Sequence, residues 1–177
     1  PERDAYMSMK VTKEMKKEWG INTDQIFEQA WENEELPILQ GINDNVLSVE
    51  SGCDLFAMKQ IDESSQGIMY ALRNSRLVDG AALIAFPGVA EKLGELFSKG
   101  YYVLPSSIHE TLILPKGEEK PNTETALKVL GQMVWDINQN HVRREEVLSN
   151  RIYEYDRESR EIRQVPESIK KERGMER

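Results

Sequence analysis

Apolar residues recur at helical spacing in two segments near the start of the chain. The first segment predicts a short amphipathic helix over residues 12–19, and the second, which follows Asn22, predicts a helix over about 23–34. Because the link between them is short, we expect the two helices to form an αα-hairpin. Trp19 and Trp31 lie on the apolar stripes, and large aromatic side chains usually anchor cores, so we expect both to pack against the main core.

Short β-type runs follow the break at Pro37 and Gly41. They predict strands at 44–49, 54–61 and 67–73, joined by segments with turn chemistry. The strand at 54–61 begins with apolar residues on both faces, which favours a central position in the sheet. An antiparallel meander is the simplest topology for such strands.

Residues 79–98 allow two interpretations. Apolar residues at alternating spacings of three and four favour one helix over about 80–98, started by Asp79 and kinked near Pro87. The alternative is a buried strand over 81–86, closed by Pro87 and followed by a helix.

The longest β-type run lies between Gly100 and Lys116. It predicts a strand at 101–104, a tight turn at 105–107 and a strand at 108–114, which together form the central hairpin. Period two places Glu110 on an otherwise apolar face of the second strand. Because a buried carboxylate is costly without a partner, we expect Glu110 near the strand end in water or beside a fixed partner.

The rest of the chain predicts a helix and a hairpin. A clear helical stripe at 123–139 is formed by Ala126, Leu127, Leu130, Met133, Val134 and Ile137. Residues 151–155 and 161–165 then predict a β-hairpin, which is expected at the periphery because charged side chains protect strand edges from pairing.

Together these elements predict an α+β fold, a mostly antiparallel sheet with helices packed on one face, an N-terminal αα-hairpin and a C-terminal peripheral β-hairpin. With 177 residues in the chain, we expect a single domain over 9–165. Residues 1–8 are set aside as a leader segment or processing remnant, and 166–177 as a charged tail.

Composition narrows the classes of function. The formal net charge of −8 disfavours nucleic-acid binding, because such proteins present a basic face to the phosphates. No apolar run reaches the roughly 18 residues that span a bilayer, so no membrane partner is expected. Cys53, the single cysteine, excludes an internal disulfide or a cysteine-rich zinc site and fits a reducing cytoplasm.

Five short motifs, in this order, resemble an uncharacterised bacterial family, the domain of unknown function 5688. They are Val11-Thr12 through Trp19-Gly20-Ile21, Gly80-Ala81-Ala82 with Phe86-Pro87-Gly88-Val89, Leu104-Pro105-Ser106-Ser107-Ile108-His109-Glu110, Glu146-Val147-Leu148-Ser149, and Tyr153-Glu154-Tyr155-Asp156. The resemblance covers about residues 9–165 and corresponds to the carboxyl-terminal part of longer members. It implies a bacterial cytoplasmic protein, and because the family has no known activity it transfers no catalytic residue.

The strongest candidate for chemistry is the group Ser106, Ser107, His109 and Glu110, which contains the residue types of a nucleophile, a base and an orienting acid. Catalysis needs these groups within hydrogen-bond reach, which adjacency in sequence does not supply, and no Gly-x-Ser-x-Gly motif is present. We therefore favour the structural interpretation, in which the serines cap a tight turn and His109 makes local hydrogen bonds.

Other combinations carry weaker signals. Cys53 with His109 or His141 would form a thiol–imidazole pair, and His109, Glu110 and His141 would form a metal site, but they follow no known ligand spacing. The glycines match no phosphate-binding or dinucleotide motif, so we expect no cofactor and no metal. Four tyrosines are expected to be half-buried strand residues with hydroxyls facing water. These are Tyr101, Tyr102, Tyr153 and Tyr155.

The leading expectation for function is a non-catalytic cytoplasmic module that binds a protein or a small ligand. The alternative is a hydrolase-like enzyme that uses Ser107, His109 and Glu110. The surroundings of His109 distinguish the two: an open pocket with a serine hydroxyl in reach favours the enzyme, and a buried ring bonded to the main chain favours the binding module. Oligomeric state stays open.

Overall fold

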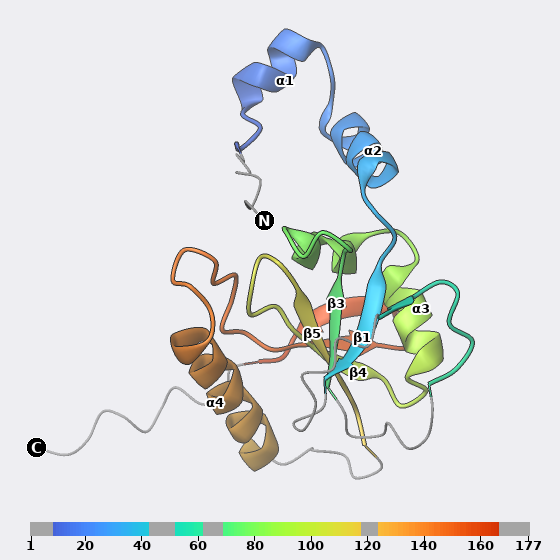
Figure 1. Ribbon diagram of the computed structural model, residues 1–177, viewed down its shortest axis with the longest axis vertical. Coiled ribbons are helices and arrows are strands. Elements are labelled where there is room, and N and C mark those ends of the chain that lie inside the picture. Colours follow the sequence, from blue (N-terminus) through green and yellow to red (C-terminus); the bar gives the residue numbers. More distant parts are fainter. Residues whose placement is uncertain (1–8, 43–51, 62–68, 118–123, 167–177) are drawn as a thin grey trace, which may run out of the picture. The chain divides into compact units, whose positions relative to one another are not determined.

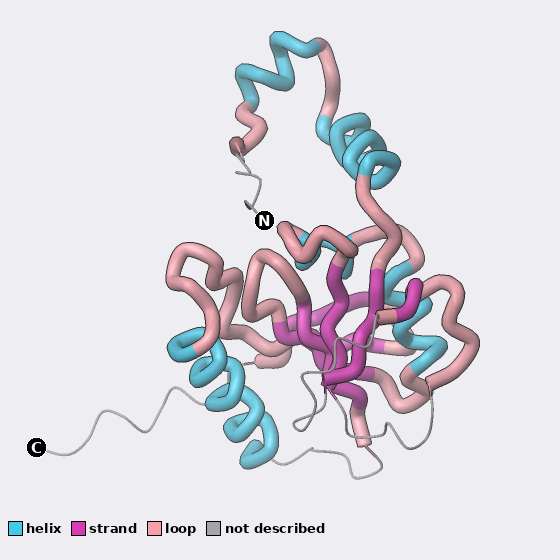
Figure 2. Tube along the Cα trace, in the orientation of Figure 1, coloured by secondary structure: helices cyan, strands magenta, loops and turns pink. Residues whose placement is uncertain are grey.

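The computed structural model describes residues 9–42, 52–61, 69–117 and 124–166 (Figures 1 and 2). Two compact units follow one another along the chain, Pro1–Glu34 and Glu35–Arg177. The first contains two helices and the second contains the sheet. The expected single domain at 9–165 stays a prediction. The segments predicted at 1–8 and 44–49, and all but the first residue of the tail predicted at 166–177, lie outside the described residues.

The helical unit contains α1 (Lys13–Trp19) and α2 (Thr23–Asn33), as the sequence predicts. Asn22 and Gln25 form a complete capping box, in which each side chain accepts a hydrogen bond from the other residue's backbone N–H. The expected burial of the tryptophans is wrong, because neither helix has a buried residue, and Trp19 and Trp31 are 50% and 36% exposed.

The described strands form one seven-stranded sheet in which every pair is antiparallel, in the order β2-β1-β3-β5-β4-β6-β7. Their bounds are β1 Ile38–Ile42, β2 Cys53–Asp54, β3 Met69–Arg73, β4 Tyr101–Leu104, β5 Thr111–Pro115, β6 Tyr153–Asp156 and β7 Glu161–Gln164. The predicted α+β class, the antiparallel sheet and the hairpin of β4 with β5 are confirmed.

Both faces of the sheet are covered, so the expectation of helices on one face is wrong (Figure 1). Tyr101 and Val103 point to a core that they share with α3 (Val89–Leu96) and the 3₁₀ helix η2 (Gly80–Ala85). Tyr102 and Leu104, which alternate with them along β4, point to a second core under α4 (Glu124–Asn140). All four residues of β4 are buried, because a central strand between two helical layers has no solvent face.

The predicted central strand at 54–61 is wrong. Only Cys53–Asp54 pairs, as the edge strand β2, and the chain then turns. Phe56 N–H donates to Asp54 Oδ1 at 2.9 Å, and Leu55 N–H donates to Pro37 O at 2.8 Å, so the backbone bonds go to a turn rather than a ladder. Leu55 is fully buried, which explains the apolar pattern without a strand. The break expected at Pro37 and Gly41 is instead the site of β1.

The single helix predicted over 80–98 is wrong, and so is the strand of the alternative, whereas the helix that the alternative places after Pro87 is present as α3. The chain forms η2, turns at Pro87 and Gly88, and then forms α3. Gly88 has φ +80°, a left-handed conformation that interrupts the helix and that glycine adopts without strain. Asp79 also has positive φ, and its side chain makes no capping hydrogen bond with η2.

The remaining elements follow the prediction closely. The helix expected at 123–139 is α4, and the last hairpin is β6 with β7, of which β7 is an edge strand. The expectation that tyrosine hydroxyls face water is wrong for Tyr101, whose hydroxyl donates to Ala90 O at 2.9 Å while its ring stacks on Tyr155 at 5.0 Å. Burial raises the pKa of Tyr101. None of the helices that the structure describes has both the length and the apolar character needed to cross a membrane.

Candidate functional site

Three loops meet at one end of the sheet, and the predicted site residues lie in the middle loop. These are loop 74–79 after β3, loop 105–110 between β4 and β5, and loop 141–150 after α4. The main chain joins them. Ile108 O accepts from Ala81 N–H at 3.1 Å, Ile108 N–H donates to Glu146 O at 3.0 Å, and Leu148 N–H donates to Ser106 O at 3.0 Å. The predicted strand over 108–110 is therefore wrong, because the backbone groups of Ile108 bond to η2 and to loop 141–150, and the ladder begins at Thr111.

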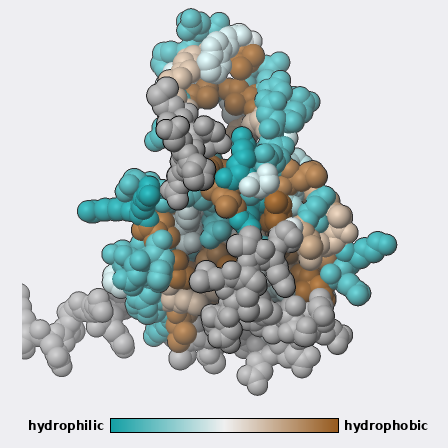
Figure 3. Space-filling view, in the orientation of Figure 1, coloured by the Kyte–Doolittle hydropathy of each residue, from teal (hydrophilic) through white to brown (hydrophobic). Residues whose placement is uncertain are grey.

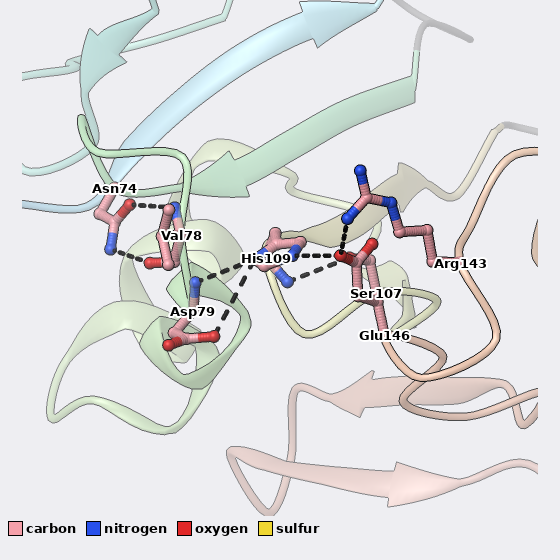
Figure 4. Close-up of polar contacts among 7 residues, drawn as sticks. All are labelled: Asn74, Val78, Asp79, Ser107, His109, Arg143 and Glu146. Carbon is pink, nitrogen blue, oxygen red and sulfur yellow. Dashed lines mark hydrogen bonds and ion pairs between the residues drawn. The ribbon is translucent and has the colours of Figure 1, made fainter. Parts of the chain in front are cut away.

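His109 lies between the two outer loops, and both of its ring nitrogens are engaged (Figure 4). Nδ1 accepts from Asp79 N–H at 3.2 Å, and Nε2 lies 3.4 Å from Glu146 Oε1. A nitrogen that accepts a main-chain hydrogen bond carries no proton, so in the neutral ring the proton is on Nε2, facing Glu146. The side chain is 31% exposed.

Glu146 is shared between His109 and Arg143, whose Nη1 lies 3.5 Å from the same Oε1. The Glu146 side chain is half-buried, whereas Arg143 is mostly exposed. A guanidinium exposed to this degree contributes little to stability by itself. The main structural partner of Glu146 is therefore the half-buried ring of His109.

Loop 74–79 is held so that its backbone reaches His109. The buried Asn74 side chain donates to Val78 O at 2.9 Å and accepts from Val78 N–H at 3.4 Å. Leu77 and Asp79 have φ of +59° and +56°, which side-chain-bearing residues adopt only where the surroundings enforce it. At the start of η2, Gly80 leaves no space for a Cβ, which would lie 2.8 Å from both Asn74 N and His109 O.

The hydroxyl of Ser107 bonds to the main chain, and Ser106 is buried. Ser107 Oγ accepts from the backbone N–H of His109 at 3.0 Å, which closes a local turn, and Ser107 also forms an isolated bridge with Val147. Ser106 is 2% exposed, and its backbone N–H donates to Leu104 O at 2.9 Å. Ser107 therefore closes a local turn, as the structural interpretation expects, whereas Ser106 takes part through its backbone N–H and C=O.

The acid beside His109 is Glu146 rather than Glu110. Glu110 is half-buried in the loop, so its expected place on an apolar strand face is wrong. No local pattern in the sequence indicates Glu146 or Asp79, because each lies about 30 residues or more from His109. The only signal that pointed to residue 146 was its place in a family motif.

The other candidate pairs are not brought together. Cys53 is exposed on β2, which β1 and β3 separate from β5. His141 follows α4, donates its N–H to Ile137 O at 2.8 Å, and lines a shallow concave surface along that helix with Val129, Met133 and Ile137. Among the residues that the structure describes, no three His, Cys, Asp or Glu side chains are grouped to hold a metal ion.

The contacts of His109 fit a structural role better than a role as a general base. A histidine that acts as a base for a nucleophile needs one nitrogen on the orienting acid and the other free for the hydroxyl. Here Glu146 takes the position of the acid, but the main chain of Asp79 occupies the other nitrogen. The imidazole thus links loop 74–79 to loop 141–150 across its own loop.

Comparison with known proteins places the chain in a family. No curated protein and no solved structure matches it significantly. One family model, described as a family of unknown function, matches residues 1–157. This match covers most of the chain and includes all three loops around His109, and we conclude that the chain belongs to the family of unknown function DUF5688.

Proposed function

We propose that this protein is a non-catalytic module that binds another protein through the aromatic surface of its helical unit. The single observation that supports this most is the exposure of Trp19, Phe27 and Trp31 on helices that bury no residue. Amphipathic helices normally cover their apolar stripe, and exposed aromatic clusters are typical of protein-binding sites. Figure 3 shows apolar surface on this helical unit.

The stripe on α2 has the spacing of a helix that enters a groove. Phe27 and Trp31 lie four residues apart, with ring centroids 6.1 Å apart and tilted by 32°. Residues at this spacing share one helix face, which is how amphipathic helices present their anchors to a partner groove. Phe27 is 52% exposed, so more than half of its surface is available for burial.

Charge indicates the chemistry of the partner. Asp24, Glu28 and Glu32 recur every four residues and form a ridge next to the aromatic ridge, and α2 contains no lysine or arginine. The complementary partner is a protein with an apolar groove that has basic residues along one rim. Opposite charge at the rim mainly speeds association and fixes orientation, while the aromatic anchors supply most of the affinity.

The surroundings of His109 support a non-catalytic protein. Both ring nitrogens are engaged, and Ser107 Oγ bonds to the main chain. The hydrolase-like alternative needs the Asp79 contact to open before the ring can accept a proton from a serine. A bacterial cytoplasm is the setting implied by the resemblance to the family, and it belongs to the same proposal.

The test compares wild-type protein with the double variant Phe27→Ala/Trp31→Ala and with Gln29→Ala, a matched control on the opposite side of α2. Quantitative affinity capture first selects proteins that the double variant loses and the control keeps. A selected partner is then purified and its Kd is measured for all three proteins at low and high salt.

The proposal predicts that the double variant raises the Kd at least about 30-fold, as loss of two hot-spot aromatics does, and that salt weakens binding. The control should bind like wild type. The proposal is contradicted if the double variant binds every purified candidate normally. It is also contradicted if the protein shows a turnover that Ser107→Ala abolishes while circular dichroism shows an intact fold.

A further inference from the structure

The contacts of His109 define one protonation state of the ring. Because Nδ1 accepts from Asp79 N–H at 3.2 Å, this contact exists only while Nδ1 is unprotonated. A second group lies on the same side of the ring, since Asp79 Oδ1 is 3.9 Å from Nδ1. One residue therefore offers Nδ1 a hydrogen-bond donor at short distance and an acceptor just beyond reach.

We propose that His109 is a protonation switch that exchanges the backbone N–H of Asp79 for the Asp79 carboxylate and thereby changes the conformation of loop 74–79. In the neutral ring the Asp79 N–H bond holds the loop. When Nδ1 gains a proton, two donors face each other and the bond is lost. A shift of about 1 Å then brings Oδ1 to the distance of a charge-assisted hydrogen bond.

The opposite side of the ring stays attached in both states. Nε2 carries a proton whether the ring is neutral or charged, so it faces Glu146 Oε1 throughout. Protonation turns this contact into an ion pair, in which Arg143 competes for the same carboxylate oxygen. The movement is therefore confined to the contact with loop 74–79, while loop 141–150 stays in place.

The charged groups around the ring give the cation an acceptor on each side. Loop 74–79 contributes Asp79, loop 141–150 contributes Glu146 and Arg143, and the loop of His109 itself contributes the half-buried Glu110. The carboxylates of Asp79 and Glu146 lie beside different nitrogens of the ring, Nδ1 and Nε2 respectively. Protonation thus redirects a contact rather than expelling the ring from the site.

Only a few residues of loop 74–79 are expected to change conformation when the Asp79 bond is lost, because both ends of the loop are held. Asn74 holds Val78 from one side, and Gly80 is fixed because its neighbours leave no space. Leu77 and Asp79 both have positive φ, which is strained for leucine and tolerated by aspartate, and the Asp79 bond helps to maintain this conformation. Loss of that bond lets these residues relax, and the exposed side chain of Leu77 moves with them.

Nuclear magnetic resonance of the full chain tests the switch. The ring ¹⁵N shifts report the tautomer, and the amide signals of Leu77 and Asp79 report the loop, between about pH 8 and about pH 5, where histidines change charge. His109→Asn is the first variant, because its Oδ1 can accept from Asp79 N–H and does not titrate. His141→Gln is the matched control, since it removes the second histidine.

The proposal predicts the Nε2–H tautomer at about pH 8, and Leu77 and Asp79 amide shifts that titrate with the same midpoint as the ring. On the acid side, hydrogen-exchange protection of the Asp79 amide should fall about fivefold or more, as loss of a neutral hydrogen bond predicts. His109→Asn should abolish the transition, and His141→Gln should leave it unchanged.

Three results would overturn the switch. They are the Nδ1–H tautomer at about pH 8, an Asp79 amide that does not respond while the ring titrates, and a transition that disappears in His141→Gln. If His109→Asn does not fold, Glu146→Gln replaces it. Its Asp79 amide should still change together with the ring, because the Asp79 contact is retained, and an Asp79 amide that stays unchanged while the ring is protonated would contradict the switch.

Discussion

Gly80→Ala is the sharpest perturbation of the loop cluster, because the new methyl group has no space. An added Cβ would lie 2.8 Å from Asn74 N, 2.8 Å from His109 O and 3.3 Å from Arg73 Cα. All three are backbone atoms, so no side-chain rotation relieves the contact and the loops themselves must separate. Overpacking of this kind typically costs about 1–3 kcal/mol, and we expect the upper part of this range because two of the contacts are shorter than any that Cβ atoms normally make.

The assay is thermal and guanidinium unfolding followed by circular dichroism. At about 2–4 °C per kcal/mol for a protein of this size, Gly80→Ala should lower the melting temperature by about 5–10 °C. Gly117→Ala is the matched control, because the structure places no atom within 4 Å of its added Cβ among the residues that it describes. A Gly80→Ala protein as stable as the control would refute the close approach of η2 to the His109 loop.

Three further changes test other parts of the structure. Thr111→Val removes a buried hydroxyl that donates to Ala81 O at 3.2 Å and should lower the unfolding free energy in guanidinium by about 1–3 kcal/mol; unchanged stability would show that this bond contributes nothing. Burial raises the pKa of Tyr101, so above about pH 10 the unfolded chain loses a proton that the native state keeps. Stability should therefore fall by up to about 1.4 kcal/mol per pH unit there, and urea unfolding of Tyr101→Phe should show a smaller slope, whereas an identical slope would contradict this. Gly131→Ala adds a Cβ 3.9 Å from the nearest side chain and should raise the melting temperature through about 1 kcal/mol of helix propensity; a lower melting temperature would be inconsistent with that open space.

Local patterns predicted the elements whose stability is local or simply periodic. The stripe of α4, the capping box at Asn22 and Gln25, and the hairpin of β4 with β5 all follow from spacing. Errors arose where tertiary contacts replaced the pattern. Leu55 is buried by packing beside a turn, and η2 and α3 share one apolar stripe although Gly88 interrupts the helix. The uninterrupted apolar run of β4 indicates a sheet covered on both faces, an indication that the prediction of helices on one face did not use.

The sequence predicted the local contacts of the site but not the long-range partners of His109. The turn role of Ser107 is local and follows from residue type. The partners of His109 come from loops on either side in sequence, and the backbone N–H of Asp79 belongs to no motif. Adjacency suggested Glu110 as the acid, whereas the pairing of loop 105–110 with loop 141–150 brings Glu146 to the ring. Such pairing depends on the whole sheet and leaves no short-range pattern.

The central claim is that His109 links two loops as a structural residue, and its most direct test is the stability of His109→Ala. The variant loses the Asp79 bond and the Glu146 contact, which together should contribute about 2 kcal/mol, or about 4–8 °C in melting temperature. His141→Ala, at an exposed position, should change the melting temperature by less than about 2 °C. If His109→Ala instead has the melting temperature of wild type while a defined turnover is lost, the account is contradicted and His109 is a catalytic residue.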